Sequence, residues 1–166
     1  MKIPFRISLP LLGAALFSAH CAFADMETDK EIIYKAAGLK HSGDDLHNEC
    51  DNPVTPKLAP LKLGGAVGEA VVVHVEDSAC YSNTGKRITI LKHEAGNYRP
   101  IFSNLANGIE PLKGGAFGVY DIRLDVPGSS TPVWRWNGNK YVLFSNMSVQ
   151  NVRMPVAGAL PAAPTR

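Results

Sequence analysis

The sequence lacks several features that would assign it to a class at once. Beyond its first 24 residues it has no long apolar run, which excludes a later transmembrane helix because about 20 apolar residues are needed to cross a bilayer. No serine lies in a nucleophile-elbow pattern, and neither Gly64-Gly65 nor Gly114-Gly115 opens a helix that would hold a phosphate. The sequence therefore gives no support to serine-hydrolase chemistry or to nucleotide binding.

A surplus of one charge sign is also missing. The whole chain has 17 Lys and Arg against 15 Asp and Glu, a net charge of +2. Lys2 and Arg6 belong to the N-terminal segment described next, so 15 basic residues remain against 15 acidic ones. With no basic stripe, neither nucleic acid nor an anionic membrane is the expected partner.

The N-terminus has the pattern of a secretory signal peptide over residues 1–24. Lys2 and Arg6 form its positive part, residues 7–17 form a short apolar core, and Ala22-Phe23-Ala24 has the small residues that a signal peptidase needs. We expect cleavage between Ala24 and Asp25 and a periplasmic or secreted protein with no transmembrane segment in its mature chain. The apolar core is too short for a membrane anchor.

Cysteine is scarce, and its placement is informative. Cys21 leaves with the signal segment; a lipoprotein alternative would use it, but His20 stands where such signals have a small residue. Cys50 and Cys80 remain, and in an oxidising compartment the default is a disulfide between them. It would stabilise the fold by about 3 kcal/mol through the unfolded state. A metal pair or a catalytic thiol is the alternative, and no further ligands stand close to either cysteine.

The fold class expected is mainly β (α+β), with one N-terminal helix followed by antiparallel hairpins in a single domain, residues 25–148. Thr28 and Glu31 suggest a capping box for a helix over residues 28–38. Residues 41–60 show no periodicity and are expected to be a loop. The tail, residues 149–166, is rich in Ala and Pro, and we expect it to be flexible. Short β-branched and aromatic runs predict strands at 69–76, 86–94, 97–104, 119–126, 131–136 and 139–146.

The two halves of the β region suggest an internal repeat. Each half has a strand, a linker with Ser and Thr, and a hairpin with Gly-Asn in its turn: Gly96-Asn97 and Gly138-Asn139. Two copies would form two related β-units. Between the strands, residues 108–118 and 127–131 are the loops expected to be most exposed.

The order of motifs carries a resemblance. The segments ACYSNTG, ITILKHEAGNYRPI, GVYDIRLDVPG and PVWRWNGNKYV resemble a group of small secreted proteobacterial proteins of unknown function with FG-GAP-like β-repeats, over residues 31–144. The resemblance implies an Asp-rich calcium loop before the first strand. This chain has KLGGAVGE at residues 62–69 instead, where only Glu69 remains as a carboxylate ligand, whereas calcium takes six to eight oxygens. We therefore expect no calcium here, and no cofactor.

Histidine and carboxylate residues gather in one segment, HSGDDLHNE. A metal centre would use its side chains together with His74, which shares a strand face with Glu76. The alternative is a solvated loop with ordinary surface charges and a structural His74. The candidates in the segment are His41, Asp44, Asp45, His47 and Glu49.

The hairpin around Asn137-Gly138 offers the candidate binding residues. Trp134 and Trp136 share one strand face, Arg135 points to the other face toward Asp121, and Tyr141 lies across the hairpin. Aromatic residues on one face of a strand form either a core or a binding platform, and the core is the commoner use.

The functional expectation is an exported, non-catalytic protein that binds a protein or envelope component. An inhibitor or immunity protein against a cell-envelope hydrolase is its concrete version. The alternatives are a metal-dependent enzyme or metal carrier using the segment from His41 to Glu49, and a structural accessory of an envelope complex. The sequence predicts no catalytic residue.

Overall fold

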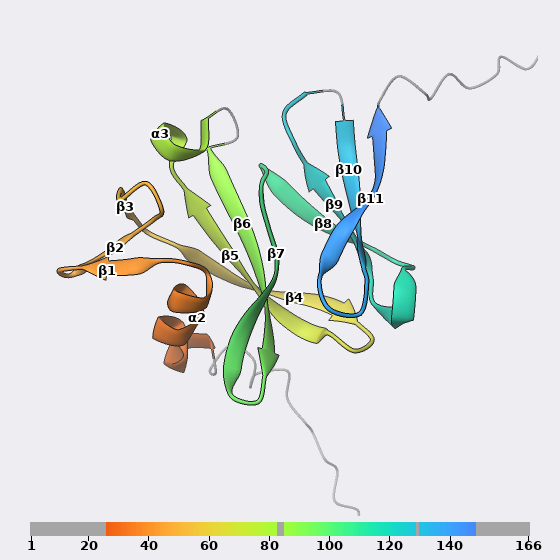
Figure 1. Ribbon diagram of the computed structural model, residues 1–166, viewed down its shortest axis with the longest axis horizontal. Coiled ribbons are helices and arrows are strands. Elements are labelled where there is room, and N and C mark those ends of the chain that lie inside the picture. The colour runs from red at the N-terminus through yellow and green to blue at the C-terminus, as the bar shows by residue number, and fades with distance from the viewer. Residues whose placement is uncertain (1–25, 83–84, 129, 149–166) are drawn as a thin grey trace, which may run out of the picture.

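The computed structural model describes residues 26–82, 85–128 and 130–148. The expected signal peptide and tail lie outside these residues. The chain is mainly β, as predicted, with three antiparallel sheets and short helices. In Figure 1 an N-terminal helix and small sheet lie on the left, one four-stranded sheet in the middle and a second on the right. No helix in the described part is long and apolar enough to cross a membrane.

The middle sheet is an antiparallel meander whose second strand is buried on both faces. That strand, β5, is the apolar run predicted from the sequence, and all but its ends and His74 are buried. Val72 faces one hydrophobic core, while Val71 and Val73 face another. The strands are β4 (Lys57–Gly64), β5 (Gly68–Glu76), β6 (Lys86–Glu94) and β7 (Asn97–Leu105).

The second four-stranded sheet packs on one face of the middle sheet and repeats its meander topology. The shared core contains Ile88 and Ile90 from the middle sheet, and Ile122 and Leu124 from the second sheet. Both four-stranded sheets are antiparallel meanders, and the internal repeat stays a prediction. The elements are β8 (Gly108–Leu112), η2 (Ala116–Gly118), β9 (Asp121–Asp125), β10 (Ser130–Trp136) and β11 (Tyr141–Ser148).

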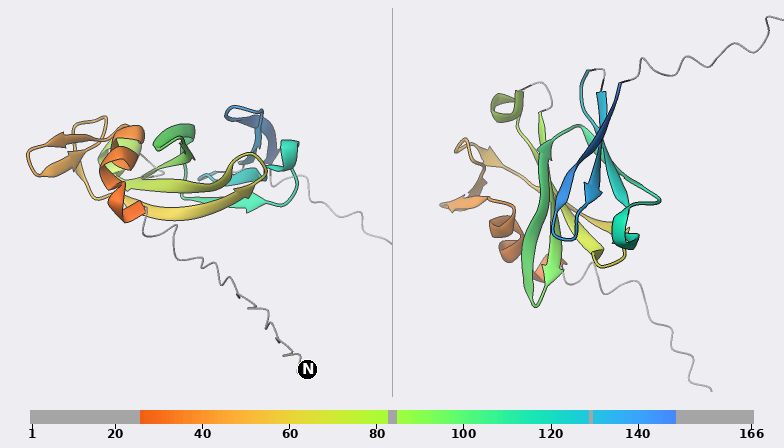
Figure 2. Two further views of the ribbon diagram at one scale, coloured as in Figure 1. Left: turned by 90° about the horizontal axis from the view of Figure 1, so that it is seen from below. Right: turned by 45° about the vertical axis from the view of Figure 1, so that its right-hand side comes forward.

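The N-terminal layer covers the other face of the middle sheet. Ile33 from the helix and Tyr81 from α3 pack in the second core with Val73 and Leu91. In both views of Figure 2, this layer and the second sheet lie on opposite sides of the middle sheet. Its elements are α2 (Lys30–Ala36), the three-stranded sheet β1 (Lys40–Ser42), β2 (Asp45–His47) and β3 (Pro53–Val54), and α3 (Ser78–Tyr81).

Two predicted turns form, with different chemistry. Ala95 and Gly96 join β6 to β7 as a two-residue loop, and both have positive φ, at 50° and 76°, as a type I′ turn requires. The hairpin of β10 and β11 closes through four residues, 137–140, because the side chain of Asn137 accepts hydrogen bonds from the N–H groups of Asn139 and Lys140.

Three expectations were wrong. The N-cap of helix α2 is Asp29 and not Thr28, and the side chain of Asp29 makes no capping hydrogen bond; the side chain of Glu31 lies against His41. Residues 41–60 contain strands and not a continuous loop; β1 is fully exposed, so it carries no alternation in its sequence. Residues 108–112 form edge strand β8, and sequence reasoning missed it because Gly108 and Pro111 are poor strand residues tolerated at a sheet edge.

Candidate functional site

The inner side of the hairpin of β10 and β11 is a structural aromatic cluster. Trp136 and Tyr141 are only 2% and 4% exposed, and their rings lie 5.8 Å apart. Trp134 is partly buried against the same core, with its ring 5.1 Å from that of Phe102. These three predicted candidates therefore hold the two sheets together and do not form an open platform.

Burial also sets the chemistry of Tyr141. Its hydroxyl donates a hydrogen bond to the backbone oxygen of Tyr120 at 2.7 Å. Burial raises the pKa of Tyr141 well above its ordinary value, and the negative charge of Asp121 raises it further. The phenol therefore stays neutral in the fold and acts as a hydrogen-bond donor between β11 and the start of β9.

The outer side of the hairpin carries the Arg135–Asp121 pair that the alternation suggested. Nη2 of Arg135 donates to Oδ2 of Asp121 at 2.7 Å, and Nε donates to Oδ1 at 3.0 Å. This hydrogen bonding raises the pKa of Arg135. The guanidinium also lies over the ring of Phe144, 3.4 Å from its centroid, in a cation–π contact.

Phe144 is exposed and lies at a β-bulge. The pairing of β10 with β11 shifts between Val133 and Trp134, so that Leu143 and Ser145 have partners and Phe144 is the extra residue. Phe102 follows the turn glycine of the other hairpin at the same distance along the chain, yet it is 6% exposed while Phe144 is 54% exposed. The pairing of β6 with β7 also shifts, between Ile90 and Leu91, so each of the two hairpins has an irregularity near its phenylalanine.

A groove of about 450 Å³ lies beside this hairpin, between the edge strands β7 and β11. Leu143, 51% exposed, and Trp134 line it on one side, and Pro100 and Ile101 on the other. Near the hairpin turns, Nη1 of Arg99 donates to the backbone oxygen of Asn139 at 3.0 Å and ties the two sheets together. The described part of the chain thus presents Leu143 and Phe144 on either side of one edge strand.

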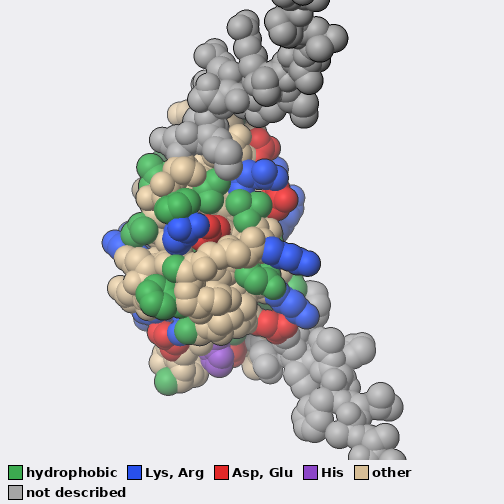
Figure 3. Space-filling model, turned by 90° about the vertical axis from the view of Figure 1, so that its right-hand side faces the viewer, with side chains coloured by type: hydrophobic (Ala, Val, Ile, Leu, Met, Phe, Trp, Pro, Cys, Tyr) green, Lys and Arg blue, Asp and Glu red, His purple; other side chains and the backbone are tan. Residues whose placement is uncertain are grey.

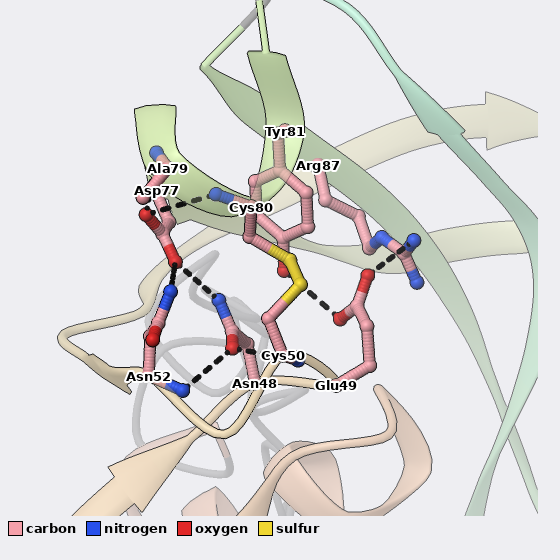
Figure 4. Close-up of a disulfide and its surroundings, with 9 residues drawn as sticks. All are labelled: Asn48, Glu49, Cys50, Asn52, Asp77, Ala79, Cys80, Tyr81 and Arg87. Carbon is pink, nitrogen blue, oxygen red and sulfur yellow. Dashed lines mark hydrogen bonds and ion pairs between the residues drawn. A yellow bond between two sulfur atoms is a disulfide. The ribbon is translucent and has the colours of Figure 1, made fainter.

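The predicted disulfide between Cys50 and Cys80 is present, with Cα atoms 5.9 Å apart. Figure 4 shows it within a polar network that fixes the segment between β2 and β3 to α3. Asp77 caps α3 and accepts hydrogen bonds from the amides of Asn48 and Asn52 at 2.7 and 2.8 Å. The Asn52 hydrogen bond, followed by that of Asn48, lowers the pKa of Asp77.

Glu49 and Tyr81 complete that network on the other side of the disulfide. Glu49 accepts a hydrogen bond from the hydroxyl of Tyr81 and pairs with Arg87, whose guanidinium lies 5.3 Å from the centre of the Tyr81 ring. Burial, reinforced by Glu49, raises the pKa of Tyr81 to about 12. The residues around the disulfide therefore have a structural role. Glu49, one of the candidate metal ligands, is among them.

The two histidines of the candidate metal segment have separate partners. In the hairpin of β1 and β2, His41 lies opposite Leu46, and His47 lies opposite Lys40. Nε2 of His41 is 2.6 Å from Glu31, and Nδ1 of His47 is 2.9 Å from the backbone oxygen of Asp51. Within the residues that the structure describes, no three His, Cys, Asp or Glu side chains are grouped to hold a metal ion.

His74 lies apart from that segment. It is half-buried on β5, and burial lowers its pKa, with a smaller contribution from the charge of Lys86. Its strand neighbour Glu76 pairs with Lys57 and Lys86, each at 3.3 Å. Glu76, which shares a strand face with His74, thus belongs to a surface ion-pair network.

Sequence reasoning missed the most exposed large hydrophobic side chains of the second four-stranded sheet and its loops, which are Phe117, Leu143 and Phe144. Alternation along β11 would have placed Phe144 on the side of Arg135, and an aromatic within the glycine-rich run KGGAFG was a second sign. Comparison with protein-family models, with curated proteins and with solved structures found no match.

Proposed function

We propose that the protein is an exported, non-catalytic binding protein whose partner is a protein or an envelope component. In its concrete form it is an inhibitor or immunity protein that binds a cell-envelope hydrolase. The signal-peptide pattern and the Cys50–Cys80 disulfide support export.

One observation carries the proposal: the exposed side chains of Leu143 and Phe144 on edge strand β11, with Arg135 stacked against Phe144. Aromatic and arginine side chains dominate the energetics of protein interfaces. Here the arginine is already fixed by Asp121, so it loses little conformational freedom on binding.

The character of this side of the molecule agrees with a protein partner. Figure 3 shows hydrophobic side chains in several groups, separated by backbone and by intermixed Lys, Arg, Asp and Glu side chains. A surface of small apolar groups within a mixed polar surround is the anatomy of a non-obligate interface. A uniformly basic surface, as for nucleic acid, is a different pattern.

The test is affinity capture of the partner from the envelope fraction of the producing cells, using the immobilised mature protein. Phe144→Ala should reduce capture by at least about tenfold, the size expected for an interface anchor worth more than about 1.4 kcal/mol. Ile32→Ala is the matched control, because Ile32 is 42% exposed but lies on helix α2 in the N-terminal layer.

The inhibitor form has a direct assay. The mature protein is added in excess to peptidoglycan hydrolysis by muramidases, amidases and endopeptidases, and residual activity is measured. Inhibition of one class that Phe144→Ala weakens would support the proposal. Absence of any captured protein, or capture that is equal for the wild type and Phe144→Ala, would reject it.

A further inference from the structure

The loop between β8 and β9 presents the most exposed large hydrophobic residue in the described part of the chain. Phe117 is 72% exposed, although it is an aromatic residue in a well-defined turn. Its backbone is in the left-handed region, with φ 59° and ψ 27°. A bulky L-residue rarely adopts this conformation, because its Cβ approaches the following carbonyl oxygen. We call residues 113–118 the Phe117 loop.

The turn between β4 and β5 packs against the Phe117 loop and supports it. A Cβ atom on Gly65 would lie 2.6 Å from the backbone oxygen of Phe117 and 2.7 Å from the carbonyl carbon of Gly118, so only glycine permits this approach. The N–H of Tyr120 donates to the backbone oxygen of Leu63 at 2.7 Å and fixes the exit of the loop to the same turn. The loop is therefore supported by backbone contacts and not by its own side chain.

The other side of the loop is fixed to the Arg135–Asp121 pair. A Cβ atom on Gly115 would lie 2.9 Å from Oδ1 of Asp121, and the N–H of Asp121 donates to the backbone oxygen of Gly114 at 3.1 Å. Asp121 in turn binds Arg135, on which Phe144 stacks. A continuous chain of contacts thus joins the two exposed aromatic residues, Phe117 and Phe144.

An unfavourable backbone conformation persists where surrounding contacts over-determine it, and such positions concentrate at ligand clamps and other functional sites. Phe117 has this conformation, while little of its ring is removed from water. Glycine at this position would relieve the strain with little loss of packing. Position 117 therefore carries an exposed aromatic ring, although the stability of the fold would favour glycine there.

We propose that Phe117 is a preorganised anchor that inserts into an apolar pocket of a protein partner, next to the surface formed by Phe144. This inference rests on the proposed binding function and names the group that enters the partner. A ring held on a fixed backbone loses little entropy when it is buried. Removing it should weaken binding by at least about 30-fold, equivalent to about 2 kcal/mol.

The first experiment replaces Phe117 by the photo-crosslinking residue p-benzoylphenylalanine in the full exported chain. The same residue at position 32 is the matched control. Irradiation of the producing cells should give one discrete adduct with a protein from position 117 and none from position 32. No adduct from position 117, or equal labelling from both positions, would overturn the anchor role.

The second experiment compares Phe117→Gly with the wild type in stability and in binding to the cross-linked protein. Phe117→Gly should unfold at the same or a higher temperature and bind at least about 30-fold more weakly. Ile32→Ala should bind as the wild type does. A Phe117→Gly protein that melts lower and binds within threefold of the wild type would show that the ring is structural.

Two outcomes separate this inference from the broader proposal. If the wild type captures a partner and Phe117→Gly captures it equally well, the anchor is rejected while the binding function stands. If no protein is captured and Phe117 instead governs co-sedimentation with vesicles of phosphatidylethanolamine and phosphatidylglycerol, both are rejected in favour of a membrane surface.

Discussion

Asp121 on β9 and Arg135 on β10 form an ion pair across the second sheet, and its two partners differ in exposure. The side chain of Asp121 is 8% exposed, whereas that of Arg135 is 34% exposed. If the pair is broken, the guanidinium of Arg135 can be hydrated, whereas the carboxylate of Asp121 stays buried. The carboxylate also lies next to Gly115 of the Phe117 loop, so the pair connects the hairpin to that loop.

This asymmetry predicts the order of two substitutions. Arg135→Ala leaves a buried carboxylate unpaired and should lower the melting temperature by several degrees, more than Asp121→Ala, because an uncompensated buried charge is costly. The double variant should recover part of the loss, as a double-mutant cycle by thermal unfolding would measure. Arg123→Ala is the control, since the Arg123–Glu110 pair is exposed and should contribute little. Equal losses for Arg135→Ala and Arg123→Ala would contradict this.

Trp136 should be the more important of the two tryptophans for stability. Trp136→Ala should lower the free energy of unfolding by about 3–5 kcal/mol, the usual cost of removing a fully buried aromatic ring. Trp134→Ala should cost less, because its ring is only partly buried. Denaturant titrations measure both values, and acrylamide should quench the fluorescence of Trp136 poorly in the wild type. Ready quenching of both indoles in the folded protein would contradict the structural role.

If the protein is exported as proposed, the disulfide between Cys50 and Cys80 should be complete. Thiol counting under denaturing, non-reducing conditions should find neither Cys50 nor Cys80 free. The variant with Ser at both positions should lose about 3 kcal/mol of stability, the amount expected for closing a loop of this length. Two free thiols in the protein isolated from its producing cells would contradict the prediction, because the network around Asp77 would then join the β2–β3 segment to α3 without a covalent bond.

The β4–β5 turn should bind no calcium. Gly64, Gly65 and Gly68 keep positive φ there, as a sharp turn needs, and Glu69 pairs with Lys62 at 3.6 Å. Adding millimolar calcium to chelator-treated protein should leave the melting temperature unchanged, since a ligand that does not bind the native state cannot stabilise it. A rise of several degrees would show that this turn, or another part of the chain, holds the ion.

Alkaline pH should destabilise the fold through Tyr81. Its pKa is raised from 10.0 to about 12, so the native state holds the proton more tightly than the unfolded chain does. The stabilisation is complete below pH 10 and is lost as pH rises from 10 through about 12. Urea titrations at pH 9 and pH 11 should show this fall, and Tyr81→Phe should make it shallower. A fall of the same size in Tyr81→Phe would assign the effect to other groups.

Much of the β architecture was readable from the sequence because a period of two is a local property. Strands β5, β6 and β7 lie within a residue of the predicted ranges, and the alternation around Arg135 correctly separated the inner from the outer side of the hairpin. Two cysteines in an export context also sufficed to predict the disulfide, because few alternatives remained.

Elements without periodicity needed the tertiary structure. The strands within residues 41–60 are short, partly exposed and fixed by Asp77 and the disulfide from elsewhere in the chain. The metal cluster failed to assemble because a turn put His41 and His47 on separate positions, each with its own partner. Nothing in the spacing of these residues carries that information.

The sequence by itself determined the β class, most of the strands after residue 68, the two faces of the tryptophan hairpin and the Cys50–Cys80 disulfide. Only the tertiary structure decided which aromatic residues reach the surface. Phe102 and Phe144 lie at the same distance from their hairpin turns. Trp134 and Tyr141 of the second sheet cover the ring of Phe102, whereas Phe144 lies on the outer side of that sheet and stays exposed. The backbone at Phe117 packs directly against Gly65, some fifty residues earlier in the chain. Only glycine allows this contact, because a Cβ atom at position 65 would clash with the Phe117 carbonyl oxygen.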